Sequence, residues 1–519
     1  MPASITDKYK RMMLDGMWRS FYNLDVDSNR DSDFYYIGIG RSEDWVNDES
    51  PPVPSPDTAT VKSFQSGLQG VKQVVDLSYV VPRYNWSAGS TYTAWSNRNH
   101  SDTTVGALQD IAGPYYVITD EQNVYVCLQQ GMTDQGVVRN SIYKPDKISA
   151  EAFEAGPDGY VWKFLYNVGV YNARRYLTSE WMPVERIVDS TEGGPNYGSL
   201  SASRLAQLIN QEVATPGEVI AIRVENGGSG YSQSTVLGEA PLVTVHTPNF
   251  LDENYAAKAY ARVNDDGEIF QVVMKTSPLA TEFSFGREYD KRTYVSVTGG
   301  GGSGARLVPE VHLDSGGMAF DPRNDLNASS LMYGVRIIGD EYKIFNVNND
   351  FRQAGLIRNM TRDSLNDSNY TGVIGDSAFT GVRGNALRKI YVGTGIDDTL
   401  TDLDNTVTGL SSGSVAYLDY YETYIDSDCC DSDLNTSHNV LYVHQSDSTG
   451  YGSFEKGEVV ELSSAAGTAT IIAHADSDIP ALRWADVDAF SGEVFYVDNR
   501  VPIDRDEDQT EDIKIVIDL

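Results

Sequence analysis

Alternation of apolar and polar residues is the main pattern along this chain, and it predicts strands. Short runs of β-branched and aromatic residues are separated by clusters of Gly, Asn, Asp and Ser, which favour turns. The clearest strand predictions cover residues 34–39, 115–118, 124–128, 219–224, 494–497 and 513–517. Helical spacing is rarer, and it predicts helices over residues 7–22 (N-cap Thr6), 58–76 and 201–212. We therefore expect a mainly β protein with some α (α+β), multidomain, with sandwich-like β domains and long loops.

Composition changes along the chain and suggests where its parts begin and end. The N-terminal zone holds most of the tryptophans: Trp18, Trp45, Trp86, Trp95, Trp162 and Trp181. A second zone contains a weak repeat, in which a short β run ends in GGSG. A third zone is acidic and rich in Ser, Thr, Asp and Gly. The predicted division is an N-terminal aromatic-rich β/α region (1–212), a Gly-rich β insert (213–320), a return to the core (321–364), an acidic β insert (365–484) and C-terminal core strands (485–519).

Charge narrows the possible partners. The 519 residues include 40 Lys and Arg and 74 Asp and Glu, which gives a formal net charge of −34. Binding to nucleic acid or to anionic lipid needs clustered basic residues, so we expect neither partner. Three cysteines are too few for a disulfide framework, and two of them, Cys429 and Cys430, are adjacent. The N-terminus lacks the apolar region of a secretory signal, and no apolar stretch is long enough for a membrane helix. Synthesis in the cytoplasm is the expectation.

Candidate metal sites are incomplete in the sequence. Cys429 and Cys430 lie near His438 and His444, but the CxxC spacing of zinc sites is absent. Acidic residues alternate over residues 25–31 as in a calcium loop, without the Gly and Glu that such a loop needs at its sixth and twelfth positions. A similar alternation follows residue 503. Solvated charged loops are the simpler interpretation, and we predict no metal site, although a bound cation stays an alternative.

Motifs of enzymes are also missing. The chain has no GxSxG or SxxK motif and no motif-bearing Cys/His pair. The GGSG turn could suggest a phosphate-binding loop, but Tyr231 follows Gly230 where a P-loop carries Lys. We predict no enzymatic activity, no catalytic residue and no cofactor.

Several segments, taken together and in order, carry a family resemblance. They are residues 21–48 (FYNLDVDSNRDSDFYYIGIGRSEDWVND), 80–86 (VVPRYNW), 115–128 with 156–168, 349–360 (NDFRQAGLIRNM) and 492–519. This set resembles the baseplate wedge subunit of T-even-type bacteriophages, the gene-eight product family. The chain departs from the family pattern in the inserts at 213–318 and 365–484.

The resemblance implies a structural role. Members of this family are non-enzymatic subunits that form homodimers within the wedge, contact other wedge proteins and help to hold the baseplate in its metastable form before tail contraction. The implied location is the tail baseplate of the virion, after synthesis in the host cytoplasm. One alternative is a carbohydrate-binding or adhesive tail-associated β protein, which the 32 Tyr and 7 Trp residues favour. A tail-associated hydrolase is a weaker alternative, which rests on the acidic insert.

Residues within the resembling segments are candidates for subunit contacts. Arg and Glu side chains can form charge-assisted hydrogen bonds across an interface, and Trp is a frequent anchor there. An intramolecular role for each residue is the competing interpretation. The candidate interface residues are Arg41, Glu43, Trp45, Arg83, Trp86, Trp162, Arg352, Asn499 and Arg500.

Overall fold

A computed structural model shows a mainly β protein. It describes residues 5–22, 33–97, 114–185, 201–232, 234, 239–248, 252–314, 316–347, 350–363, 378–393, 405–424, 438–463, 467–472 and 481–519. Strands account for 41% and helices for 12% of the structure, in several separate antiparallel sheets, which confirms the mainly β prediction. The chain divides into two compact units: unit 1 is Met1–Leu14, Ser78–Met332 and Ile517–Leu519, and unit 2 is Asp15–Leu77 and Tyr333–Val516. The division into five segments stays a prediction.

The described helices are short. They are α1 (Asp7–Phe21), α2 (Thr58–Ser66), α3 (Gly169–Tyr176), α4 (Ala202–Val213), α5 (Pro322–Asp325) and the 3₁₀ helix η2 (Glu253–Tyr255). The predictions for α1 and α4 are confirmed, and the amide of Tyr9 donates to Thr6 Oγ1 at 3.4 Å. None of these described helices combines the length and the apolar character needed to cross a membrane.

The predicted helix over 58–76 is wrong beyond Ser66. Gly67 ends the helix, and its amide donates to the Ser63 carbonyl. The following residues form strand β2 (Leu68–Gln73), which pairs on both edges with other strands. Apolar residues at this length fit either period, and only the distant strand partners decide between them.

Unit 2 contains a five-stranded sheet whose central strands are buried on both faces. Its order is β17 (Arg383–Asn385), β2, β1 (Tyr35–Gly40), β16 (Phe351–Arg358) and β25 (Glu493–Ile503). Every residue of β1 is buried. Tyr36 joins a cluster with Phe64 of α2 on one face, whereas Ile39 joins a cluster with Phe345 on the other. Burial on both faces explains why this strand is a continuous apolar run.

A seven-stranded sheet also belongs to unit 2. Its order is β23 (Thr468–Thr470), β22 (Val459–Leu462), β19 (Thr406–Gly409), β20 (Val415–Tyr424), β21 (His438–His444), β18 (Arg388–Gly393) and β24 (Leu482–Arg483). Residues such as Ile390, Leu418 and Leu441 form its apolar core. The described part of the acidic segment 365–484 therefore folds around a core of its own.

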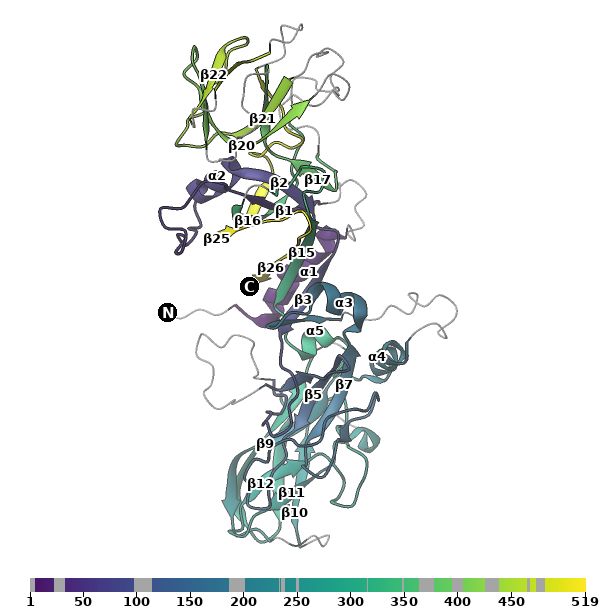
Figure 1. Cartoon of the computed structure of the whole chain (residues 1–519). Coiled ribbons are helices and arrows are strands. Elements are labelled where there is room, and N and C mark those ends of the chain that lie inside the picture. The colour runs from purple at the N-terminus through teal and green to yellow at the C-terminus, as the bar shows by residue number, and fades with distance from the viewer. Residues whose placement is uncertain are drawn as a thin grey trace. The chain divides into compact units, whose positions relative to one another are not determined.

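Unit 1 contains three further sheets. One has the order β4 (Tyr116–Ile118), β5 (Asn123–Gln129), β7 (Val161–Asn167) and β6 (Phe153–Glu154). The second has the order β12 (Ile269–Val273), β11 (Ala259–Val263), β10 (Pro241–His246) and β13 (Tyr294–Gly299), and the third pairs β14 (Ser303–His312) with β9 (Glu218–Ser229). Figure 1 shows β9 to β12 grouped together within this unit.

One more sheet has the order β26 (Thr510–Asp518), β15 (Ser330–Ile338), β3 (Leu77–Pro82) and β8 (Trp181–Val184).

The two GGSG segments of the sequence repeat lie on paired strands. Ser303 of β14 pairs with Ser229 of β9, so the segments face each other. Gly228 adopts a φ of 67° and packs so closely that a Cβ there would meet the Ser303 carbonyl at 2.5 Å. Only glycine fits at this close approach of β9 and β14. The first GGSG segment therefore takes part in strand pairing and is not simply a turn.

Ser201, the first residue of the predicted helix over 201–212, is the N-cap of α4. Ser201 Oγ accepts a hydrogen bond of 3.2 Å from the Arg204 amide, and α4 lies beside β7 (Figure 1), where Asn210 Nδ2 donates to the Phe164 carbonyl at 2.9 Å. Ser201→Ala is expected to lower the free energy of unfolding by about 1 kcal/mol, because one amide loses its acceptor. Chemical denaturation measures the change. Ser201→Asp should keep the stability, and an equal loss in both variants would contradict the cap.

Candidate functional site

The loop of residues 41–57, which follows β1, is held in place by one buried arginine. Arg352 lies on β16, next to β1, and its side chain is only 5% exposed. Its Nη1 donates to the Ser42 carbonyl at 2.6 Å and to Asp350 Oδ1 at 2.7 Å. Its Nη2 donates to Asp48 Oδ2 at 3.0 Å and also bonds Asp44. A single guanidinium thus ties together three positions of the loop.

The charges of this cluster support one another. The hydrogen bond from Arg352 holds the pKa of Asp48 below its ordinary value. Burial alone would lower the pKa of Arg352, but its bonds to Asp48 and the charge of Asp350 raise it. The guanidinium therefore stays charged in this buried cluster.

A second set of contacts fixes the loop to the edge strand β25. The indole Nε1 of Trp45 donates to the Arg500 carbonyl at 2.9 Å, and Asn499 Nδ2 donates to the Pro52 carbonyl at 2.8 Å. The Arg41 guanidinium lies 3.9 Å from the centroid of the Trp45 ring, a cation–π distance. Arg41 itself adopts a φ of 61°, which few non-glycine residues do. The loop is therefore built into one conformation.

A buried histidine connects the start of the loop to the seven-stranded sheet. His444 on β21 has its Nδ1 2.6 Å from Asp419 Oδ2 of β20, and its Nε2 lies 3.0 Å from Glu43 Oε1. Ser42 Oγ donates to the other oxygen of Asp419 at 2.9 Å. Burial disfavours the charged imidazole, but the two carboxylates prevail and raise the pKa of His444 to about 10. The same contact lowers the pKa of Glu43 against the effect of its burial.

The outward side of the loop is apolar and acidic. Val46 and Val53 are the most exposed apolar side chains of this segment, at 110% and 91%. Val501 of β25 is half exposed, and the Asp44 side chain is 67% exposed although it pairs with Arg352. A rigid loop that displays apolar side chains suits association with another protein, because little conformational entropy is lost on binding.

The structure brings most of the candidate interface residues to this loop site, which we define as residues 41–57 with Arg352 and β25. Glu43 and Arg352 anchor the loop from within, and the other members support its surface. The predicted residues that meet here are Arg41, Glu43, Trp45, Arg352, Asn499 and Arg500.

The other candidates lie in unit 1 and have intramolecular partners. Arg83 Nη1 donates to the Thr178 carbonyl at 2.7 Å, and Trp86 Nε1 donates to Ser141 Oγ at 3.2 Å. Trp162 is fully buried and packs edge-to-face on Tyr92, with ring centroids 5.4 Å apart. For these three residues the contacts seen within unit 1 are those of the intramolecular interpretation.

Sequence reasoning missed His444 and Asp419 as parts of the site. Each is a single residue in an ordinary strand. They lie 25 positions apart, and their partners in the loop, Ser42 and Glu43, lie hundreds of positions away, so no spacing motif could reveal them. Burial raises the pKa of the Cys127 thiol above its ordinary range, which does not suit a nucleophile. Within the described ranges, no group of three or more His, Cys, Asp or Glu residues is placed to hold a metal. Cys429, Cys430 and the acidic alternation at 25–31 lie outside the described residues.

Comparison of the chain with protein-family models and with curated proteins finds no match.

Proposed function

We propose that this chain is a structural subunit of a contractile-tail phage baseplate wedge, a non-enzymatic assembly component that binds neighbouring wedge subunits and a second copy of itself. The observation that carries the proposal is the anchored loop site, whose rigid outer face displays Val46 and Val53. In this proposal the units are sandwich-like β domains joined by long loops, and the subunit resides in the virion after synthesis in the host cytoplasm.

Pairing of the resembling segments also supports the proposal. The segment at 21–48 contributes β1, the segment at 349–360 contributes β16, and the segment at 492–519 contributes β25. These strands are neighbours in one sheet, with Ile37 opposite Leu356 and Gly355 opposite Val497. The segments at 115–128 and 156–168 likewise contribute the neighbouring strands β5 and β7. Because these segments pair with one another as neighbouring strands, we expect a family that shares this sheet to retain all of them.

Two measurements test the function. Sedimentation equilibrium of the purified 57.1 kDa chain should give the mass of a dimer. Immunogold labelling of particles that carry the chain should place the gold at the tail tip. A monomer that is absent from purified particles would contradict the proposal.

The double variant Val46→Asp/Val53→Asp is expected to abolish incorporation into particles without changing stability. Both side chains are exposed, so the folded chain loses no packing, whereas an interface would bury two unpaired carboxylates. Quantitative immunoblotting of purified particles measures incorporation, and thermal unfolding measures stability.

Val382→Asp is the matched control, because Val382 is 57% exposed in the same unit but lies outside the loop site. Particles with this variant should contain the normal amount of subunit. Normal incorporation of the double variant would show that the outer face of the loop makes no essential contact.

A further inference from the structure

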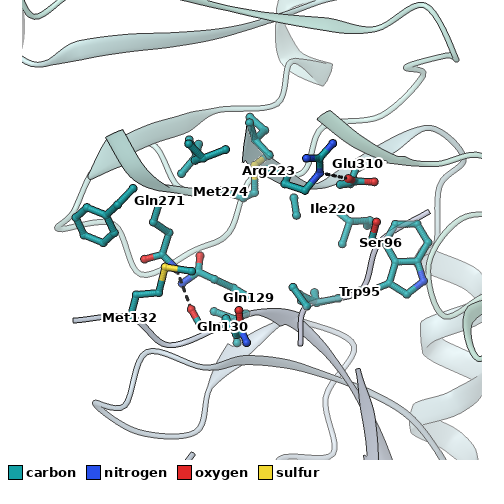
Figure 2. Close-up of a pocket in the computed structure, with 18 of the residues that line it drawn as sticks. Trp95, Ser96, Gln129, Gln130, Met132, Ile220, Arg223, Gln271, Met274 and Glu310 are labelled. Atoms are coloured by element: carbon teal, nitrogen blue, oxygen red, sulfur yellow. Dashed lines mark hydrogen bonds and ion pairs between the residues drawn. The ribbon is translucent and has the colours of Figure 1, made fainter. Parts of the chain in front are cut away.

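Unit 1 contains a large cavity that the structural role does not use. Its volume is about 940 Å³, and its walls come from residues 93–96, the end of β5 and strands β9, β12 and β14. Figure 2 shows Trp95 and Ser96 on one side of the space, Gln129 and Gln130 on another, and Arg223 with Glu310 on a third. Small-molecule sites have volumes of about 300–1,000 Å³, so the cavity is large enough for a ligand of several rings.

The charged side chains of the cavity form ion pairs of opposite sign. Arg223 Nε lies 3.2 Å from Glu310 Oε1, and its Nη2 lies 2.8 Å from Glu225 Oε1. Arg306 Nε lies 2.8 Å from the second oxygen of Glu225. The described lining thus holds two guanidinium groups against two carboxylates. A phosphate or another anion would have to compete with these carboxylates, so an uncharged ligand fits better.

Neutral hydrogen-bonding groups in the cavity are held in fixed orientations. Gln271 is 6% exposed; its Nε2 donates to the Gln130 carbonyl at 2.8 Å, and its Oε1 accepts from Arg262 Nη1 at 2.6 Å. Gln129 Nε2 donates to the Gly159 carbonyl at 3.3 Å. A carboxamide has two N–H donors and two acceptor lone pairs, so each of these bonds leaves capacity for a ligand. A carboxamide presents a donor and an acceptor side by side, so it can hydrogen-bond to two neighbouring hydroxyl groups of a sugar ring.

Aromatic side chains supply the apolar part of the lining. Phe283 and Phe285 are stacked with their ring planes 4° apart, and Phe270 lies beneath the Arg262 guanidinium at 4.7 Å. Trp95 packs on His312, with ring centroids 5.2 Å apart. Flat apolar rings beside fixed amides suit a ligand with apolar C–H faces and polar edges.

We propose that this cavity binds a neutral oligosaccharide. The paired positive and negative charges disfavour a strongly ionic ligand. The carboxamides can hydrogen-bond to hydroxyl groups, and the aromatic rings can pack against the C–H faces of the sugar. A neutral peptide could pair with the outer edge of β9 or β14, which form a two-stranded sheet, and it is the alternative occupant that the test below distinguishes. The inference goes beyond the assembly role, and its failure would leave that role untouched.

Isothermal titration of the full chain with maltohexaose, cellohexaose and chitohexaose tests the proposal. At least one should bind with a Kd of about 1 mM or tighter. Hexagalacturonate, which is anionic, should bind at least tenfold more weakly than the best neutral sugar. Absence of binding by all three neutral sugars, or preference for hexagalacturonate, would overturn the proposal. Binding of acetyl-hexaalanine amide in place of the sugars would overturn it in favour of a peptide.

Variants assign the binding to the cavity. Ala94→Phe fills the space and should weaken sugar binding at least tenfold, whereas Leu279→Phe, at a 95% exposed position outside the lining, should not. Gln129→Leu removes one amide at nearly constant size and should also weaken binding, which keeps the test valid if the first variant is unstable. Binding that survives both cavity variants would place the sugar elsewhere and refute the inference.

Discussion

Replacing Arg352 with methionine is expected to lower the free energy of unfolding of unit 2 by about 3–5 kcal/mol, because it removes one partner of a buried ionic cluster. The Arg352 side chain is 5% exposed and meets the carboxylates of Asp44, Asp48 and Asp350. Methionine fills a similar length but leaves these carboxylates and the Ser42 carbonyl without their donor. Urea denaturation followed by tryptophan fluorescence measures the loss.

Arg358→Met is the matched control on the same strand. The Arg358 side chain is 30% exposed; it pairs with Glu493, whose side chain is 63% exposed, and lies 3.6 Å from Asp33. Water screens these pairs, and their removal is expected to cost about 1 kcal/mol, well below the loss in Arg352→Met. Limited proteolysis adds an independent measurement, since cleavage within residues 42–50 should accelerate only in Arg352→Met. Equal destabilisation by the two variants would show that burial of Arg352 is not what holds the loop.

The sequence predicted the strands well because their signal is local. The runs at 34–39, 124–128 and 494–497 are apolar over the length of a strand; β5 and β25 cover the last two, and β1 covers the first from residue 35. Failure came in the segment after Ser66, where the same apolar content fits either a helix or a strand. There the pairing of β2 with β1 decides the outcome, and pairing is a property of the fold.

For the candidate site too, the sequence could indicate some of the residues but not the contacts between them. Arg41, Trp45 and Arg500 could be selected because large or charged side chains within resembling segments attract attention. Their mutual contacts could not be predicted, because Trp45 and Arg500 are separated by 455 positions. The amide-lined cavity escaped detection for a related reason: Gln129 and Gln271 are ordinary residues until the fold brings their strands together.

Raising the pH from about 6.5 to about 10 is expected to destabilise unit 2 through His444. Its folded pKa is raised from 6.5 to about 10, whereas the unfolded chain keeps the ordinary value. The folded state therefore holds the proton more tightly. This stabilisation is fully present below pH 6.5 and is lost as the pH rises toward 10, with a slope of at most about 1.4 kcal/mol per pH unit.

A neutral replacement isolates this contribution. The variant His444→Gln/Asp419→Asn keeps two hydrogen-bonding side chains of similar shape but removes the titrating pair, so its stability should not follow this slope. The groups that face His444 are Asp419, Glu43 and the stacked ring of Tyr417, whose centroid lies 5.3 Å away. His312 in unit 1 also has a raised pKa, because Asp325 outweighs the effect of burial, and it contributes equally to both proteins.

Urea denaturation at intervals across this pH range measures the difference between the two proteins. The advantage of the wild-type chain should shrink steadily as the pH increases, because each step removes part of the proton that only the folded state retains. A constant difference across the range would mean that His444 is neutral in the folded chain. In that case Glu43 would lose the positive charge of His444, and the start of the loop would be held by Arg352 and by the hydrogen bond from Ser42 to Asp419.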